Sequence, residues 1–397
     1  MMNEHLLRGI LYFTRETRIM DGMAAVCGRD DFRAAACDGR EIREKTLFDL
    51  ASVTKLFTGI TLMRLIETGT LDPQRRITDY CSAFSGLRSL TVEQAMGFQR
   101  LIQTPERIDE QESRENALAI LREARNAGPT GPRAYSDIPA MILKYVIEAA
   151  AEMPMYACIK KLILEPADMR ETWAGVPEDR KKDCLIYGPE YRIEGEKKIR
   201  REAPARGIPH DPKAGLLQGD SGDLCGHAGL FSTLGDMEKL AQALLAERIL
   251  KKESLKKLAV NRTGRRRPDG SYTQYLGYQC YLKHPDQYYS EIPAAMGPEA
   301  FGIGGFTGNH FSVDPQNHRY TIFLGNRVRD RLTVLIPPAG KQRADYGLNA
   351  DGTGEIIWED GSRHFSSVDY VHQKDAHFHT AAETALKGSK MRSGDFR

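Results

Sequence analysis

Apolar side chains recur at helical spacing in one segment near the start of the chain. Steps of three and four residues separate Val53, Leu56, Phe57, Ile60, Met63 and Ile66. This spacing places side chains on one face of an α-helix. Gly69 follows the last of them and suits the end of a helix, where a left-handed residue is common. The pattern therefore predicts a helix that Ser52 opens and that ends near Gly69.

Shorter patterns predict further helices and several strands. The predicted helices cover about residues 4–15, about 236–245 and a closing segment that ends near Leu386. The predicted strands cover about residues 22–28, 32–37, 309–314 and 319–325, the first two being joined by a turn at Arg29-Asp30-Asp31. Residues 355–365 are typical of a hairpin that turns at Asp360-Gly361. The polar residues from about 387 to 397 are expected to fray.

Ser52 and Lys55 are the first candidates for chemistry. A serine hydroxyl is a poor nucleophile at neutral pH, so a serine enzyme needs a neighbouring activator. A lysine three residues later in a helix lies on the same face, and the helix N-terminus offers a free N–H group and a positive dipole to a developing oxyanion. Ser-x-x-Lys is also a short pattern, and serine is a common N-cap. The segment therefore predicts a nucleophile with its activator, or a structural cap.

The residues around Ser52 resemble the first motif of the β-lactamase and penicillin-binding-protein superfamily, especially its class C-like serine hydrolases. The resemblance covers about residues 5–380 and implies an α+β fold, in which an antiparallel sheet flanked by helices joins a mainly helical second lobe. The four predicted strands would then share one antiparallel sheet. The implied division places 1–50 and 295–385 in the sheet lobe, 51–294 in the helical lobe and 386–397 in a flexible tail.

A second segment, Arg133-Ala134-Tyr135-Ser136-Asp137-Ile138, resembles the family's Tyr-x-Asn motif, with Asp137 where asparagine is usual. The resemblance makes Tyr135 a second base and Asp137 a substrate-side residue. A cation beside a tyrosine favours the phenolate, so we expect Lys55 to lower the pKa of Tyr135 and let it relay protons. Two alternatives stay open. Tyr135 also suits a half-buried aromatic before a helix, and Ser136-Asp137 also fits a Ser-Asp-Asn motif in which Ile138 replaces the asparagine.

A third segment, from Ala300 to Pro315, resembles the family's strand pair that carries Lys-Thr-Gly or His-Thr-Gly, then Phe-Thr-Gly. Aligned on Phe306-Thr307-Gly308, the first triplet becomes Ile303-Gly304-Gly305 and loses both the cationic or imidazole group and the hydroxyl. Backbone donors survive such changes, so the N–H of Phe306 is expected to pair with that of Ser52 as an oxyanion hole, beside Gly304 and Gly305. The same glycines also fit a closely packed strand pair without a catalytic role.

Two histidine segments resemble elements that border the family's cleft: Gly207-Ile208-Pro209-His210-Asp211-Pro212, and Gly226-His227-Ala228-Gly229-Leu230-Phe231-Ser232-Thr233. Neither His210 nor His227 has the spacing of a metal ligand or of a catalytic triad. We expect each to be a structural hydrogen-bonding group or a part of the substrate rim, and we include His227 among the substrate-binding candidates.

Gly219-Asp220-Ser221-Gly222 reproduces the tetrapeptide around the nucleophile of chymotrypsin-like proteases. Such a protease also needs a histidine and a buried aspartate supplied earlier in the chain, on a double β-barrel. This chain places long helical patterns before residue 170. We therefore interpret Ser221 as part of a glycine-rich loop.

The composition excludes several classes of protein. With 56 Lys+Arg against 54 Asp+Glu, the chain has no strong field for nucleic acid or an acidic membrane. Residues 1–18 carry too many charges for a secretory signal, and no apolar run is long enough to cross a bilayer. The seven cysteines are scattered, without Cys-x-x-Cys spacing. We therefore expect a reduced, cytoplasmic protein without a structural zinc ion or a cofactor. The spacing of His372, His377 and His379 matches no familiar metal site.

The resemblance implies a serine hydrolase that works through an acyl-enzyme on a small ester, an amide or a short peptide. In that hypothesis Ser52 attacks the carbonyl, Lys55 and Tyr135 manage the proton, and Ser52 and Phe306 hold the oxyanion. Because of Ile303 and Gly304, esters and D-amino-acid peptides rank ahead of β-lactams. The alternative is a ligand-binding protein that keeps the fold without turnover. The oligomeric state does not follow from the sequence.

Overall fold

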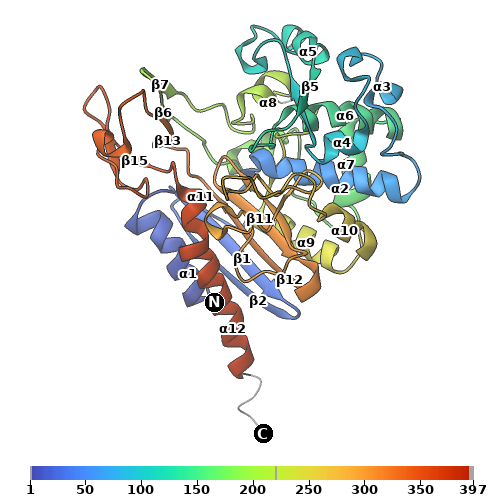
Figure 1. Cartoon of the computed structure of the whole chain (residues 1–397). Coiled ribbons are helices and arrows are strands. Elements are labelled where there is room, and N and C mark those ends of the chain that lie inside the picture. Colours follow the sequence, from blue (N-terminus) through green and yellow to red (C-terminus); the bar gives the residue numbers. More distant parts are fainter. Residues whose placement is uncertain (1, 220, 393–397) are drawn as a thin grey trace.

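The computed structural model describes residues 2–219 and 221–392, and its largest element is a six-stranded antiparallel sheet (Figure 1). The strand order is β2-β1-β12-β11-β10-β9. The strands are β1 (Met23–Arg29), β2 (Phe32–Asp38), β9 (Tyr281–Leu282), β10 (Phe301–Gly305), β11 (Asn309–Asp314) and β12 (Arg319–Gly325). β1 pairs with β12, and β12 pairs with β11. The predicted sharing of one sheet by the N-terminal hairpin and these later strands is confirmed.

Both faces of this sheet are covered, because successive side chains of a strand point to opposite faces. Ala24 and Val26 of β1 belong to the main core, whereas Ala25 and Cys27 belong to a second core on the other face. Helices α1 and α12 lie side by side over the second core (Figure 1). The elements on that face are α1 (Glu4–Leu11), the π-helical turn η1 (Tyr12–Glu16), α11 (Tyr370–Gln373), η10 (Lys374–His379) and α12 (Thr380–Arg392). The predicted first helix over 4–15 is thereby confirmed.

The middle of the chain supplies a mainly helical region around α2. Most side chains of α2 are buried on every face, so this helix forms the centre of the region. The helices are α2 (Thr54–Glu67), α3 (Ile77–Tyr80), α4 (Val92–Met96), α5 (Arg114–Arg122), α6 (Ile138–Ala151), α7 (Met155–Ile159), α8 (Pro212–Leu217), α9 (Leu234–Leu245) and α10 (Lys252–Leu258). Two short strand pairs join β3 (Phe48–Asp49) to β8 (Phe231–Ser232) and β4 (Arg100–Gln103) to β5 (Arg125–Pro129).

A second, five-stranded sheet stands beside the first, and the sequence patterns indicated only its hairpin over 355–365. Its order is β14-β15-β13-β6-β7, and β13 pairs in parallel with both β15 and β6. The strands are β6 (Glu190–Glu194), β7 (Lys197–Arg201), β13 (Arg331–Ile336), β14 (Glu355–Ile357) and β15 (Arg363–Ser366). The predicted hairpin over 355–365 is confirmed as β14 and β15.

The C-terminal helix ends later than expected. The sequence predicts an end near Leu386, but α12 continues to Arg392. The remaining residues of the predicted tail, 393–397, lie outside the described residues. Among the described helices, none has both the length and the apolar character that crossing a bilayer requires.

Candidate active site

Ser52 lies in a tight turn between β3 and α2. It belongs to the 3₁₀ turn Ala51–Val53, and α2 starts at Thr54, so Ser52 precedes the helix by two residues. Ala51 has a φ of +46°, a left-handed conformation that costs a non-glycine residue of order 1–3 kcal/mol. The Asp49 carboxylate accepts the N–H of Ala51 at 2.9 Å. The turn is therefore held in an unfavourable conformation by its surroundings.

The three predicted catalytic side chains meet at this turn. The Lys55 ammonium is fully buried and donates to Ser52 Oγ at 3.0 Å. It also donates to the His227 carbonyl at 3.1 Å. The Tyr135 hydroxyl shares a hydrogen bond with the Ser52 hydroxyl. Nucleophile, cation and phenol are thus in direct contact.

The expectation that Lys55 would lower the pKa of Tyr135 is wrong. Burial raises the pKa of the phenol well above its usual value, the negative charge of Asp137 adds to the effect, and the hydrogen bond with Ser52 offsets only part of it. The Lys55 ammonium lies over the face of the Tyr135 ring, 4.9 Å from its centroid, rather than beside the oxygen. Tyr135 is therefore a neutral phenol in the resting site.

Asp137 forms an ion pair with Lys55 at 2.7 Å, which asparagine at this position would not provide. Its second oxygen lies 3.1 Å from the Lys213 ammonium, and Lys213 also pairs with Asp211 at 3.4 Å. Burial raises the pKa of Asp137, but Lys55, helped by His227 and Lys213, outweighs burial and lowers it below its ordinary value. A chain of alternating charges thus supports the nucleophile.

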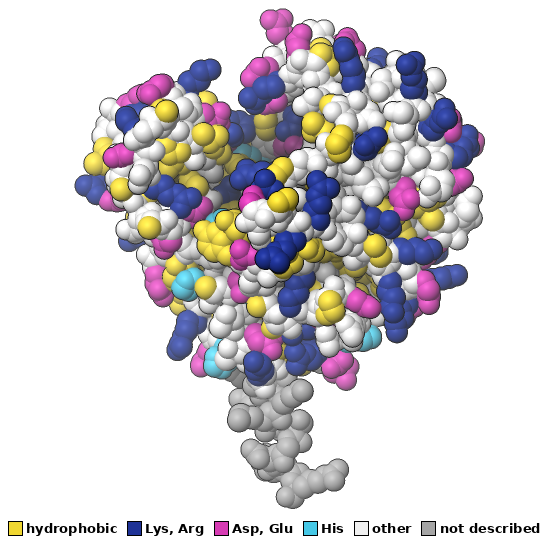
Figure 2. All heavy atoms as spheres, viewed as in Figure 1, with side chains coloured by type: hydrophobic (Ala, Val, Ile, Leu, Met, Phe, Trp, Pro, Cys, Tyr) yellow, Lys and Arg dark blue, Asp and Glu magenta, His cyan; other side chains and the backbone are white. Residues whose placement is uncertain are grey.

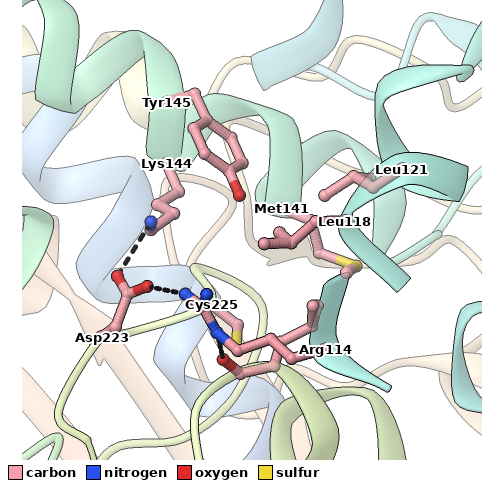
Figure 3. Close-up of a pocket in the computed structure, with 9 residues that line it drawn as sticks. Arg114, Leu118, Leu121, Met141, Lys144, Tyr145, Asp223 and Cys225 are labelled. Carbon is pink, nitrogen blue, oxygen red and sulfur yellow. Dashed lines mark hydrogen bonds and ion pairs between the residues drawn. The ribbon is translucent and has the colours of Figure 1, made fainter. Parts of the chain in front are cut away.

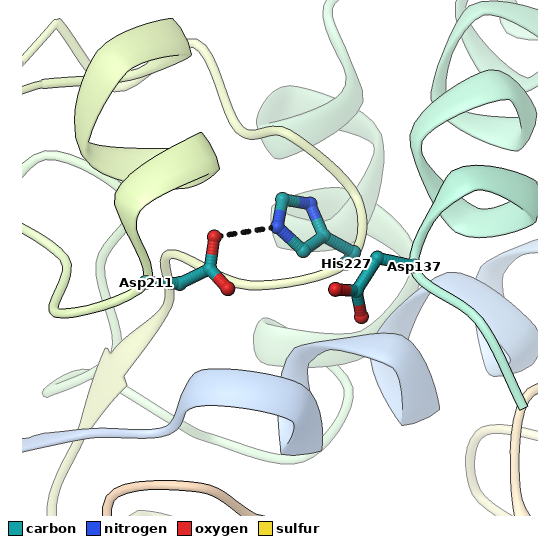
Figure 4. A group of neighbouring side chains, drawn as sticks. All are labelled: Asp137, Asp211 and His227. Atoms are coloured by element: carbon teal, nitrogen blue, oxygen red, sulfur yellow. Dashed lines mark hydrogen bonds and ion pairs between the residues drawn. The ribbon is translucent and has the colours of Figure 1, made fainter. Parts of the chain in front are cut away.

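His227 lies behind Lys55 and not at the substrate rim. Its ring is buried, and Nε2 contacts Asp211 at 2.9 Å (Figure 4). Its contribution to the site is the backbone carbonyl that accepts from Lys55. Of the two roles expected for His227, the burial and the contact with Asp211 fit the structural hydrogen-bonding group and not the substrate-binding candidate.

One group of possible metal ligands exists in the described part of the chain: Asp137, Asp211 and His227, whose ligand atoms lie within 4.8 Å of one another (Figure 4). The Lys213 ammonium already bridges the two carboxylates. A second cation there would meet like charge, so the group is better explained as an ion-pair network. The three C-terminal histidines diverge: His372 stacks on Tyr288, His377 stacks on Tyr12, and His379 packs against His310.

Two hydrogen bonds to the Gly305 carbonyl fix the orientation of the peptide group that contains the Phe306 N–H. The carbonyl of Gly305 in that peptide accepts the Tyr370 hydroxyl and the N–H of Gly308, both at 3.0 Å. In a trans peptide the N–H points away from the carbonyl, so it is directed away from both donors. A Cβ at Gly305 would lie 2.7 Å from the carbonyl of Leu50, which shows how closely β10 approaches the Ser52 turn. The geometry suits the predicted oxyanion hole.

Arg327 and His210 hold the Phe306 ring from two sides. The Arg327 guanidinium lies 4.5 Å from the ring centroid and donates to the Phe306 carbonyl at 2.6 Å. The His210 ring stacks on Phe306 with centroids 5.8 Å apart. His210 is itself buried, so it supports the oxyanion segment and does not line the rim.

Sequence reasoning missed four residues that shape the site: Lys213, Tyr281, Glu291 and Lys374. Tyr281 stacks on Tyr135 with centroids 5.1 Å apart, and Glu291 pairs with Lys374 next to Gly304. None of them belongs to a recognised motif. Of the four, only Lys213 could have been found from the sequence, because it directly follows the His210-Asp211-Pro212 element.

Ser221 lies in the loop that follows α8. Its hydroxyl donates to the Gln218 carbonyl at 2.6 Å and accepts the N–H of Asp223 at 3.2 Å. Among the residues that the structure describes, no histidine bonds to it. The loop is anchored by Asp223, which contacts Lys144 at 2.9 Å and Arg114 at 2.6 Å around a void of about 10 Å³ (Figure 3). Such a void holds one water molecule at most.

Replacing Ser221 with alanine should therefore leave turnover within about twofold of wild type. The substitution removes one loop hydrogen bond and no group that contacts Ser52. Steady-state ester hydrolysis measures the effect. A large loss of activity in a folded variant would contradict the interpretation of Ser221 as a loop residue.

A hollow opens between the second sheet and helices α5 and α8, and basic side chains line its walls (Figure 2). Lys213 lies on α8, so the charged network beside Ser52 belongs to the helical side of this hollow.

Comparisons with known proteins bear on the family and the fold of the chain. The sequence model described as Beta-lactamase matches residues 15–338. A Salmonella gallinarum protein described as "Putative D-alanyl-D-alanine carboxypeptidase" is 26% identical over 317 residues, which cover 71% of this chain and 69% of that protein. The hydrolase EstCE1, described as having promiscuous acyltransferase activity, superposes with a TM-score of 0.64 at 17% identity, covering 81% and 93%. A class C β-lactamase superposes with a TM-score of 0.60 at 13% identity, covering 81% and 90%.

Proposed function

The chain belongs to the β-lactamase family, and from this membership we propose that it is a serine hydrolase that acts through an acyl-enzyme on a small ester, an amide or a short peptide. The observation that carries the proposal is the contact of Ser52 Oγ with the Lys55 ammonium at 3.0 Å and with the Tyr135 phenol. A nucleophile held by a cation and a proton relay is the arrangement that acyl transfer requires.

In the proposed acylation, Ser52 Oγ attacks the substrate carbonyl while its proton passes to the Tyr135 oxygen. Tyr135 gives its own proton to the leaving atom, so the phenol ends the step as it began. Because the pKa of Tyr135 is raised, this exchange suits the site better than a resting phenolate. The Lys55 ammonium, held by Asp137, stabilises the charge that develops on Oγ.

The negative charge on the carbonyl oxygen would be held by the N–H groups of Ser52 and Phe306. Collapse of this intermediate breaks the bond to the leaving group and leaves the acyl group on Ser52. Water then attacks the acyl carbonyl, with Tyr135 taking its proton and returning one to Ser52 Oγ. The products are a carboxylic acid and the protonated leaving group.

The proposed substrates are small esters, amides and D-amino-acid peptides rather than β-lactams. The cation that the family's third motif usually supplies is absent, since the buried Ile303 occupies its place and Gly304 replaces the hydroxyl. The similarity to a protein described as "Putative D-alanyl-D-alanine carboxypeptidase" supports peptide substrates, and the similarity to the hydrolase EstCE1 supports ester substrates. The alternative of a non-catalytic binding protein is tested by the same experiment.

A fluorophosphonate probe, which reacts only with activated serines, tests the proposal. We expect one adduct per chain, and peptide mass spectrometry should place it on the peptide that contains Ser52. The Ser221→Ala variant should be labelled as well as wild type, and heat-denatured protein should not be labelled. No labelling of the native protein would favour the binding protein, and an adduct elsewhere would overturn the assignment of Ser52.

A further inference from the structure

A cavity of about 510 Å³ opens beside the phenol of the site. Tyr281 forms part of its wall and stacks on Tyr135 with ring centroids 5.1 Å apart, so one ring lies between the cavity and the proposed proton donor. The rings of Tyr272, Tyr275 and Tyr289 also line it. A leaving group must lie on the side from which it receives its proton. The cavity lies on the Tyr281 side of the Tyr135 phenol, which is the side towards which a leaving group protonated by Tyr135 would extend.

The inner end of the cavity is formed by Glu291, which lies against β10. A Cβ at Gly304 would be 3.0 Å from Glu291 Oε2 and 3.6 Å from Lys374 Nζ. The space that a threonine side chain would take at this position is thus filled by a carboxylate from another segment. A Cβ at Gly304 would make the Glu291 carboxylate shift by a few tenths of an ångström, so glycine leaves the space that this carboxylate uses.

Lys374 holds Glu291 in place but does not face the cavity. The ion pair between them measures 2.5 Å, and the lysine side chain is 2% exposed against 13% for Glu291. A substrate therefore meets the carboxylate first, with the ammonium behind it. At the position where the third motif would otherwise carry a neutral hydroxyl, the protein thus presents a carboxylate with its ammonium partner behind it.

Other charges of the cavity lie at or towards its rim. Arg267 is paired with Asp269 at 3.2 Å, and Arg133 is exposed to solvent, which screens its charge. Asp286 adds a second carboxylate to the lining. Aromatic faces next to carboxylates favour cations and apolar groups over anions. The wall nearest the proton donor is therefore unfavourable to a free carboxylate.

We propose that Glu291, held by Lys374 against Gly304, makes this cavity a leaving-group site that accepts neutral or cationic groups and rejects groups that end in a carboxylate. The inference rests on the proposed serine hydrolase function. It separates this protein from an enzyme that removes a C-terminal amino acid, because the departing amino acid of such a reaction carries a carboxylate. The substrate class becomes esters or amides with an uncharged or amine-bearing leaving group.

Three matched aryl acetates test this inference on the full chain: 3-carboxyphenyl acetate, 3-tert-butylphenyl acetate and 3-(trimethylammonio)phenyl acetate. The last two leaving groups have nearly the same shape but differ in charge and in acidity, so every kcat/KM below is taken relative to the rate constant for hydroxide hydrolysis of the same ester. We expect kcat/KM for the anionic ester to be at least about tenfold below that of the neutral ester, and the cationic ester to match or exceed the neutral one. Glu291→Gln should narrow the gap between anionic and neutral esters at least about fivefold.

Two further variants serve as controls. Glu291→Gln with Lys374→Met removes both members of the pair, which avoids leaving a buried lysine alone, and should narrow the gap as well. Glu299→Gln changes the net charge equally at a carboxylate that pairs with Lys256 and does not line the cavity, and it should leave the ratio unchanged. Equal rates on the anionic and neutral esters, or a ratio that neither Glu291 variant moves, would overturn the inference. Absence of Ser52-dependent hydrolysis of all three esters would instead overturn the proposed function.

Discussion

Turnover should fall by about 10⁴- to 10⁶-fold when Ser52 is replaced with alanine, and nearly as far when Lys55 is replaced with methionine. Ser52→Ala removes the atom that forms the acyl-enzyme. Lys55→Met keeps the volume of the side chain but removes the ammonium that contacts Oγ at 3.0 Å. When catalytic residues act as one unit, replacing any one of them removes nearly as much activity as replacing all of them. The double variant should therefore be little slower than either single one.

The measurement is kcat/KM for the fastest ester, with folding checked by circular dichroism. Lys144→Met is the matched control, because Lys144 is also a buried lysine paired with carboxylates, Glu148 and Asp223, but lies outside the site. It should lose stability and keep activity in the fraction that stays folded. Asp137→Asn keeps an oxygen acceptor for Lys55 and should lose about tenfold. Retention of more than a tenth of the activity in Lys55→Met would contradict the role given to the cation.

The main sheet, the helix after Ser52 and the meeting of Ser52, Lys55 and Tyr135 could be predicted from the sequence. The helix has its own periodicity, and the three side chains lie in two short motifs that each open a helix. Pairing of β1 with β12 joins residues about 300 positions apart, which no local pattern indicates; it followed from the resemblance. Neither the local patterns nor the resemblance predicted the pairing at the centre of the second sheet, because β6 and β13 pair in parallel although they are far apart in the sequence.

The arrangement of charges in the site was harder to predict than which residues form the site. The sequence shows that a lysine and a tyrosine are near each other, but not that the ammonium lies over the ring while Asp137 takes the ion pair. The loss of a cation at Ile303 was visible. The carboxylate beside Gly304 was not visible, because Glu291 and Lys374 come from segments more than 80 residues apart and meet at Gly304 only in the fold.

Glu190 connects the second sheet to the oxyanion segment. It lies on β6 with no exposed surface, accepts the Thr333 hydroxyl at 2.7 Å and Arg201 at 3.1 Å, and contacts His210 Nε2 at 3.5 Å. His210 in turn stacks on Phe306. Burial raises the pKa of Glu190, but the hydrogen bond and charge of His210, with Thr333 and Arg201, lower it to about 2.

Acid should therefore destabilise the protein through Glu190. The folded-state pKa of about 2 lies below the ordinary value of 4.5, so the ionised carboxylate stabilises the fold above about pH 4.5, and this stabilisation is lost as the pH falls towards 2. At about 1.4 kcal/mol per pKa unit, the contribution at neutral pH is about 3 kcal/mol. Glu190→Gln should be less stable than wild type by about that amount at pH 7, and the difference should shrink as the pH approaches 2.

Urea unfolding of both proteins between pH 3 and pH 7 measures this difference. Glu194→Gln is the matched control, since Glu194 lies on the same strand but is partly exposed and pairs with Arg192. It should follow wild type within about 1 kcal/mol at every pH, as expected for a partly exposed ion pair. Because His210 links Glu190 to Phe306, the activity of wild type should decline in the same acidic range, before the protein unfolds. Parallel stability curves for wild type and Glu190→Gln would show that the Glu190 carboxylate does not couple folding to pH.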